Sequence, residues 1–173
     1  MYITSAAPPD VYALADLMNR AFRGEEARQG WTHESDLLHG GVRTEPSILL
    51  ELLETPGVSL LKYVDEAGTI QGCVCLQIKP RGLYLGMLTV DPKLQGGGIG
   101  KKLLAAAEAH ARAHNCPNIH MSVISDRSEL IDWYIRHGYS DTGERLPFNP
   151  EPKFGKPSKP LTFTILEKPM VAD

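Results

Sequence analysis

The residues whose types and spacing most clearly suit a chemical function form one short stretch, Gln95-Gly96-Gly97-Gly98-Ile99-Gly100-Lys101. An apolar run, residues 84–90, precedes it, and a helical pattern, residues 101–114, follows it. A glycine-rich turn at the start of a helix presents N–H groups that have no partner within the helix. The helix dipole adds a partial positive charge at that end. Phosphate or pyrophosphate is therefore the ligand that suits this turn, and glycine leaves the main chain open to it.

Three phosphate-binding templates can be compared with this stretch. The Walker A template, G-x-x-x-x-G-K-[ST], fails because Gln95 stands at its first glycine and Lys102 at its hydroxyl position. The dinucleotide fingerprint, G-x-G-x-x-G, fails because Lys101 stands at its third glycine. The template Q/R-x-x-G-x-G/A is matched in full by Gln95, Gly98 and Gly100. A glycine turn that only caps a helix is the alternative interpretation.

With this template the sequence resembles the GNAT superfamily of acyl-CoA-dependent N-acetyltransferases. A second stretch, Leu130-Ile131-Asp132-Trp133-Tyr134-Ile135-Arg136-His137-Gly138-Tyr139, is similar to the family's helix that ends in Tyr-x-x-x-Gly-aromatic. The resemblance covers about residues 83–140. It implies the GNAT fold, which is α/β (α+β): a central mixed, mostly antiparallel sheet with one splayed parallel pair of strands, flanked by about four helices.

The resemblance implies an enzyme that transfers the acetyl group of acetyl-CoA to a primary amine by direct attack in a ternary complex. Tyr134 is then the candidate general acid, because a tyrosine with its ordinary pKa of about 10 is protonated at neutral pH. Arg127 stands where relatives often carry an asparagine that contacts the cofactor. The residues implied in acetyl-CoA binding are Leu88, Thr89, Val90, Gln95, Gly96, Gly97, Gly98, Ile99, Gly100, Lys101 and Arg127.

The general base is left open by the sequence. Many relatives place a glutamate on the strand before the glycine loop, and the comparable position here is Gly86. Proton removal then falls to a water chain or to His33, Glu34 or His120. We carry His33 forward as the candidate, with a structural histidine as the alternative.

The segment of residues 24–45 is polar and glycine-containing, and it holds aromatic and titratable side chains. Such loops often carry binding function, and in the resembling family this segment commonly forms one wall of the acceptor site. We therefore expect Trp31, His33 and Glu34, together with Tyr84 of the following strands, to face the acceptor. The alternative is a solvated loop with Trp31 packed on the core. A non-catalytic acyl-CoA-binding sensor or regulatory module on the same fold is the alternative function.

Length and composition favour one domain over residues 1–173. The net charge of −3 and the lack of a basic run do not favour nucleic acid, and no apolar stretch is long enough to cross a membrane. The three cysteines suit a reduced, cytoplasmic protein without a bound metal. The expected partner is a small-molecule or peptide amine, and a homodimer is a possible assembly.

The elements that must position these residues follow from apolar periodicity. Residues 147–160 carry five prolines and are expected to be an irregular connection. A plain surface loop is favoured there over a segment anchored above the acceptor site by Phe148 and Phe154. Strands are predicted at 2–5, 58–64, 69–78, 84–90, 119–124, 139–146 and 161–168, and helices at 8–22, 46–54, 99–114 and 125–137.

Overall fold

Seven strands form one sheet in the order β1-β3-β4-β5-β6-β9-β7. The computed structural model describes residues 1–171, apart from the side chains of residues 24 and 25. Neighbouring strands run antiparallel except β5 and β6, which are parallel. The predicted mixed, mostly antiparallel sheet is confirmed. The strands are β1 (Tyr2–Ser5), β3 (Val58–Val64), β4 (Ile70–Lys79), β5 (Gly82–Val90), β6 (Asn118–Ile124), β7 (Ser140–Phe148) and β9 (Leu161–Pro169).

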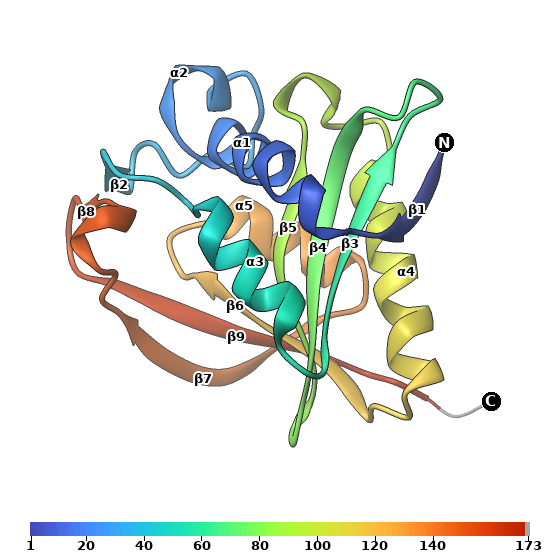
Figure 1. Cartoon of the computed structure of the whole chain (residues 1–173). Coiled ribbons are helices and arrows are strands. Elements are labelled where there is room, and N and C mark those ends of the chain that lie inside the picture. The colour runs from blue at the N-terminus through green and yellow to red at the C-terminus, as the bar shows by residue number, and fades with distance from the viewer. Residues whose placement is uncertain (172–173) are drawn as a thin grey trace.

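The helices cover both faces of this sheet (Figure 1). Along β4, Cys73 and Cys75 pack with α1 and α3, whereas Val74 and Leu76 pack with α4 and α5. This alternation follows from the two-residue period of a strand. The α-helices are α1 (Val11–Phe22), α2 (Gly24–Ala27), α3 (Pro46–Glu54), α4 (Ile99–Ala113) and α5 (Ser128–Arg136), and short 3-10 turns lie at Pro8–Asp10, Pro92–Leu94 and Pro152–Phe154.

The parallel pair is joined only at one end. β5 and β6 pair at Leu83 with Ile119 and at Tyr84 with His120, and no further. In Figure 1 the strands β3 to β5 run upright, whereas β6, β9 and β7 run obliquely away from them. The later part of β5 therefore has main-chain groups that face a gap instead of a neighbouring strand.

A β-bulge lies on β5 beside this gap. The pairing of β4 with β5 shifts register between Cys73 and Cys75, so that two residues, Met87 and Leu88, oppose Val74 alone. Met87 has a φ of 55°, which is uncommon for a residue with a side chain. Bulges bend a strand and redirect its side chains, often next to active sites.

Helix α4 carries the glycine loop at its start. One face of the helix is an apolar stripe of five buried residues: Ile99, Leu103, Leu104, Ala107 and Ala111. The stripe packs α4 against β4 to β6 and fixes its N-terminus near the diverging ends of β5 and β6. Within residues 1–171, no helix has the length and apolar character needed to cross a membrane.

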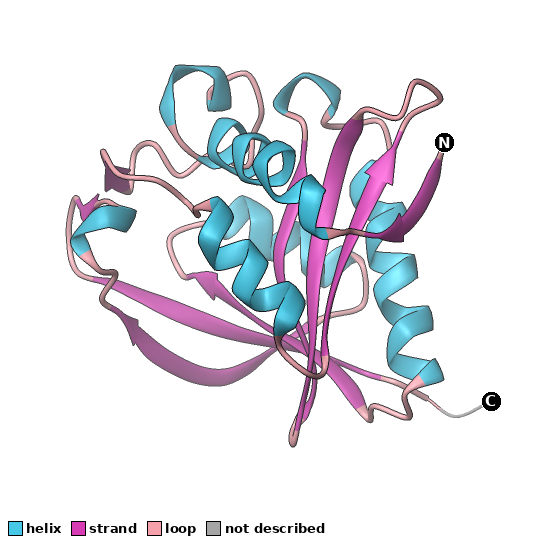
Figure 2. Ribbon diagram, in the orientation of Figure 1, coloured by secondary structure: helices cyan, strands magenta, loops and turns pink. Residues whose placement is uncertain are grey.

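The connection between β7 and β9 differs from the expectation. The prediction of an irregular plain surface loop was wrong: β7 continues to Phe148, and the short strand β8 (Lys156–Pro157) pairs antiparallel with β2 (Leu38–His39). Figure 2 shows this two-stranded ribbon apart from the main sheet. Proline is tolerated there because a two-stranded ribbon consists of edge strands. The pairing ties the connection to the segment of residues 24–45.

Candidate functional site

A cavity of about 1020 Å³ opens where β5 and β6 diverge. We call it the main cavity. Its walls come from β5, β6, the glycine loop, α5, the segment of residues 24–45 and the connection after β7. The predicted site residues that line it are Trp31, Glu34, Leu88, Val90, Gln95, Gly96, Gly98, Ile99, Gly100, Lys101, Arg127 and Tyr134.

Five residues considered from the sequence lie outside this lining. His33 borders a separate depression of about 300 Å³, where its Nδ1 accepts a hydrogen bond of 3.3 Å from the amide of Ser35. Tyr84 and His120 meet edge-on at the paired end of β5 and β6, with ring centroids 5.5 Å apart. Thr89 is buried and donates its hydroxyl to the carbonyl of Met87, at 2.8 Å. Gly97 is the fifth.

The glycine loop leaves its main chain open to a ligand. Gly96 and Gly98 have φ values of 93° and 89°, a conformation that favours glycine. A Cβ at either position would meet no atom within 4 Å, so the space beside them is free. Gly100 differs, because its Cβ would lie 3.3 Å from the ring of Trp133. The first N–H groups of α4 are thus presented beside an open volume, where an anion would be stabilised.

The side chain of Gln95 joins the glycine loop to the segment of residues 24–45. Its Oε1 accepts a hydrogen bond from the amide of Trp31, at 2.8 Å. Its Nε2 donates to Thr32 Oγ1 at 2.7 Å and to the carbonyl of Val90 at 3.2 Å. The glutamine therefore ties residues 31 and 32 to the end of β5 within the lining of the main cavity, a role that the glycine template alone did not predict.

Tyr134 projects from α5 into the main cavity wall and is buried. Burial raises the pKa of its hydroxyl above the ordinary value, and the positive charge of Arg127 opposes that rise. The ring packs edge-on against Trp133 and Tyr139, with centroid distances of 5.1 and 5.7 Å. The ring is therefore held in place, and its hydroxyl is protonated at neutral pH.

The cysteines offer no competing nucleophile. Burial raises the pKa of Cys73 to about 12 and that of Cys75 to about 11, so both thiols stay protonated and unreactive. Cys116 is also buried and free.

Within the described part of the chain, no cluster of three or more His, Cys, Asp or Glu side chains is arranged to hold a metal ion.

A buried ion cluster supports one wall of the main cavity. Glu34 Oε1 lies 3.3 Å from Arg23 Nε, and Glu34 Oε2 lies 3.6 Å from Arg127 Nη1. The three side chains are 8%, 8% and 11% exposed. Arg127 also donates to the carbonyl of Thr32. Its guanidinium is thus turned toward the segment of residues 24–45, and both carboxylate oxygens of Glu34 are engaged.

We expect Glu34→Gln to lower the free energy of unfolding by about 3–5 kcal/mol, because two buried guanidinium groups lose their counter-ion. Thermal and denaturant unfolding measure this change. The matched control is Asp36→Asn, which removes the partner of Arg28 in a pair that is 74% and 46% exposed and should cost less than about 1 kcal/mol. Equal losses in the two variants would contradict the role of the buried cluster.

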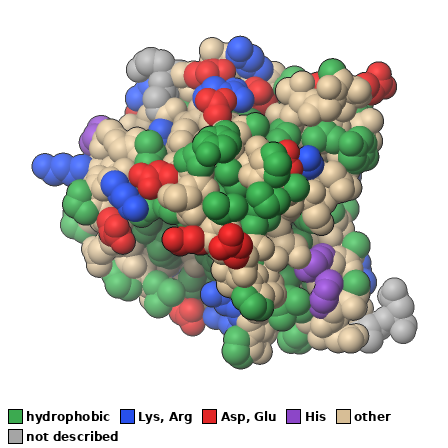
Figure 3. All heavy atoms as spheres, in the orientation of Figure 1, with side chains coloured by type: hydrophobic (Ala, Val, Ile, Leu, Met, Phe, Trp, Pro, Cys, Tyr) green, Lys and Arg blue, Asp and Glu red, His purple; other side chains and the backbone are tan. Residues whose placement is uncertain are grey.

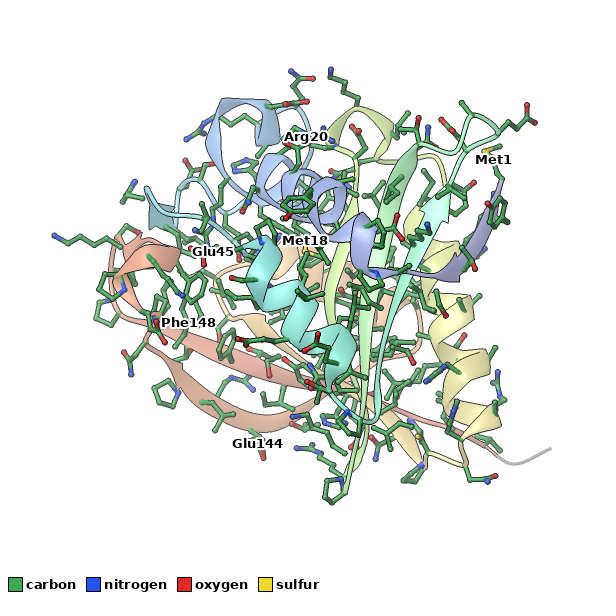
Figure 4. All side chains as sticks on the ribbon, viewed as in Figure 1. Met1, Met18, Arg20, Glu45, Glu144 and Phe148 are labelled. Carbon is green, nitrogen blue, oxygen red and sulfur yellow. The ribbon has the colours of Figure 1, made fainter. Side chains whose placement is uncertain are left out.

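Several lining residues were not predicted as site residues, although Phe148 and Phe154 were named in the alternative interpretation of residues 147–160. Phe22, Arg43 and Thr44 line the main cavity, and so do Phe148 and Phe154. Figure 4 shows Phe148 at the end of β7, on the side of the molecule where Glu45 precedes α3. Their sequence signals were weak, since an isolated arginine or threonine in a polar loop is most often solvated.

The comparisons with known proteins agree with this geometry. Residues 11–139 match the model of the acetyltransferase (GNAT) family. An IAA acetyltransferase of Azospirillum brasilense is 30% identical over 65% of this chain and 74% of its own length. A spermine/spermidine N(1)-acetyltransferase of Bacillus subtilis is 36% identical over 40% of this chain and 45% of its own length, so that match covers less than half of either protein.

A solved structure shares the fold over the whole chain. It is that of yncA from Salmonella typhimurium, determined with its cofactor acetyl-CoA. The two structures superpose with a TM-score of 0.71 at 20% identity, over 100% of this chain and 95% of the other. The family match, the sheet with its splayed parallel pair and the glycine loop at the start of α4 lead to one conclusion: the chain belongs to the acetyltransferase (GNAT) family.

Proposed function

We propose that the protein transfers the acetyl group of acetyl-CoA to the primary amine of a small molecule by direct attack in a ternary complex. One observation carries the proposal. A single cavity is lined by the glycine loop, by the unpaired edge of β5 and by the buried hydroxyl-bearing ring of Tyr134.

The donor would lie along the diverging strands. The N–H groups at the start of α4 suit the pyrophosphate of coenzyme A, and the pantetheine amides would pair with the main chain of β5 near Leu88 and Val90, as an added strand does. Lys101 lines the same end of the main cavity and adds positive charge there. The thioester would then lie between β5 and α5, within reach of Tyr134.

The reaction needs positioning more than it needs an enzyme nucleophile. The amine nitrogen attacks the thioester carbon, a tetrahedral intermediate forms, and the C–S bond breaks as the nitrogen loses a proton to water. Tyr134 donates its proton to the departing sulfur and regains one from solvent. The positive charge of Arg127, which stabilises the phenolate, would favour that donation.

Titration calorimetry with acetyl-CoA is the first test, with ATP and NADH as controls. Both tryptophans of the chain, Trp31 and Trp133, line the main cavity, so their fluorescence gives an independent signal. We expect acetyl-CoA alone to bind, and thiol release to require an added amine. No binding of acetyl-CoA would overturn the proposal.

A binding module without turnover is the second candidate. Gly86 lines the main cavity and has no group that can take a proton, and the ring of Tyr84 lies 3.2 Å from where its Cβ would be. Such a module would bind acetyl-CoA and release no thiol with any amine. The presence of Tyr134 in the cavity wall favours the enzyme.

A further inference from the structure

The charged side chains that are buried or half-buried in the main cavity wall carry a net positive charge. They are the guanidinium groups of Arg23, Arg43 and Arg127 and the carboxylate of Glu34. The acidic side chains of Glu129 and Glu151 also border the cavity, but both are exposed. On the face shown in Figure 3, by contrast, acidic and basic side chains are interspersed.

Arg43 differs from the other two arginines of this wall. Arg23 and Arg127 share the carboxylate of Glu34. Among the side chains that the structure describes, no carboxylate lies within ion-pair distance of Arg43. Its guanidinium carbon lies 5.7 Å from the ring centroid of Phe22, which orients it.

The neighbouring residue supplies an unsatisfied hydroxyl. Thr44 lines the main cavity and is 1% exposed. Its Oγ1 is buried and has no hydrogen-bond partner among the described residues. A buried polar atom without a partner is costly, and a ligand that accepts a hydrogen bond would remove that cost.

Arg43 belongs to the wall that the segment of residues 24–45 gives to the main cavity, and the glycine loop forms another part of the lining. The amide of Arg43 donates a hydrogen bond of 2.6 Å to Asn19 Oδ1 on α1, and α1 packs on the face of the sheet that carries Cys73 and Cys75, beside the bulge of β5. The start of α4 packs instead with the core on the opposite face of the sheet. The free guanidinium therefore belongs to the part of the main cavity that the acceptor would occupy, and not to the coenzyme A phosphates.

We propose that the acceptor is an amine that also carries a carboxylate, a free amino acid or a close analogue, with the carboxylate held by Arg43 and the hydroxyl of Thr44. The inference rests on the proposed function and names its acceptor class. A guanidinium binds a carboxylate through two parallel hydrogen bonds. Of the three arginines in this wall, Arg43 is the one whose guanidinium is not paired with Glu34. A polyamine, the named substrate class of the Bacillus subtilis relative, would be repelled by the same charges.

The test compares acceptors that differ in one group. Acetyl-CoA turnover is measured by thiol release with the common amino acids, with the carboxamide of each active one, and with putrescine and spermidine. We expect an active amino acid to have a kcat/KM about 10- to 100-fold above that of its carboxamide, the scale of a hydrogen-bonded charge pair. Polyamines should be poorer still.

The variant Arg43→Gln should abolish this preference. We expect kcat/KM for the amino acid to fall about 10- to 100-fold, mainly through KM, with little change for the carboxamide and none in the KM for acetyl-CoA. The matched control is Arg28→Gln, because Arg28 comes from the same segment of residues 24–45, does not line the main cavity and pairs with Asp36 at the surface. That variant should keep the preference.

The outcomes separate this inference from the proposed function. Equal turnover of amino acid and carboxamide, or preferred turnover of a polyamine, would overturn the inference and leave the acetyltransferase intact. If no amine releases thiol, calorimetry with amino acids in the presence of coenzyme A still decides: binding that is lost in Arg43→Gln supports the site, and no binding overturns it. Failure to bind acetyl-CoA would instead overturn the proposed function.

Discussion

Replacing Tyr134 by phenylalanine should lower kcat by about tenfold or more, the scale of a lost general acid, and leave the dissociation constant for acetyl-CoA unchanged. The ring stays in its packed position between Trp133 and Tyr139, and only the hydroxyl is lost, which in the proposed mechanism donates a proton to the departing sulfur. Steady-state thiol release measures kcat, and calorimetry measures the affinity.

The pH dependence gives a second readout of this role. A general acid works only while it is protonated, and burial raises the pKa of Tyr134 above its ordinary value of about 10. Its deprotonation is therefore moved to higher pH, and kcat should show no alkaline loss from this group below about pH 10. An alkaline limb near neutrality that disappears in Tyr134→Phe would assign the titration to Tyr134 and contradict its raised pKa, whereas the same kcat at every pH in both proteins would contradict its role as the acid.

The matched control is Tyr139→Phe. Tyr139 is equally a buried aromatic residue, lies in edge-on contact with Tyr134 and does not line the main cavity. Its hydroxyl is buried without a hydrogen-bond partner among the described residues, so its removal should be neutral or stabilising. Loss of kcat in both variants would point to disturbed packing of α5 and not to proton donation.

The parts of the site that were predictable from the sequence are local in the chain. The loop from Gln95 to Lys101 is contiguous, and its glycines sit at a strand-to-helix junction that apolar periodicity reveals. Tyr134 precedes Gly138 by four residues, inside one helix-to-strand motif. Helix α3 also matched its predicted bounds, because Pro46 suits a helix start and Pro56-Gly57 ends the pattern.

The cavity wall formed by residues 24–45 was not predictable in the same way, because tertiary contacts place it. The segment of residues 24–45 reaches the main cavity through the hydrogen bonds of Gln95 and through the pairing of β2 with β8. Within that segment no periodicity tells which side chains turn inward. His33 borders the smaller depression while Arg43 and Thr44 line the main cavity. The sequence does not distinguish these positions, because all three are polar residues of an irregular segment.

The glycine loop gives the other large expected effect. Gly98→Asp should weaken acetyl-CoA binding about 100-fold relative to Gly98→Asn. The two side chains are nearly isosteric, both residue types tolerate a positive φ better than most, and the space beside Gly98 is free. They differ by one negative charge, whose repulsion of a phosphate about 5 Å away costs about 3 kcal/mol at an effective dielectric constant of about 20.

Because Asp and Asn share the steric cost, the ratio of their dissociation constants isolates the charge. Gly98→Asn alone should weaken binding by less than about tenfold, the scale of strain at one residue held at positive φ. An aspartate at the start of α4 also suits the helix dipole, so the Asp variant should be at least as stable as the Asn variant in thermal unfolding. The Asp penalty should shrink with added salt, since exposed charges are screened. Equal dissociation constants for the two variants at low salt would place the pyrophosphate elsewhere than at the N-terminus of α4.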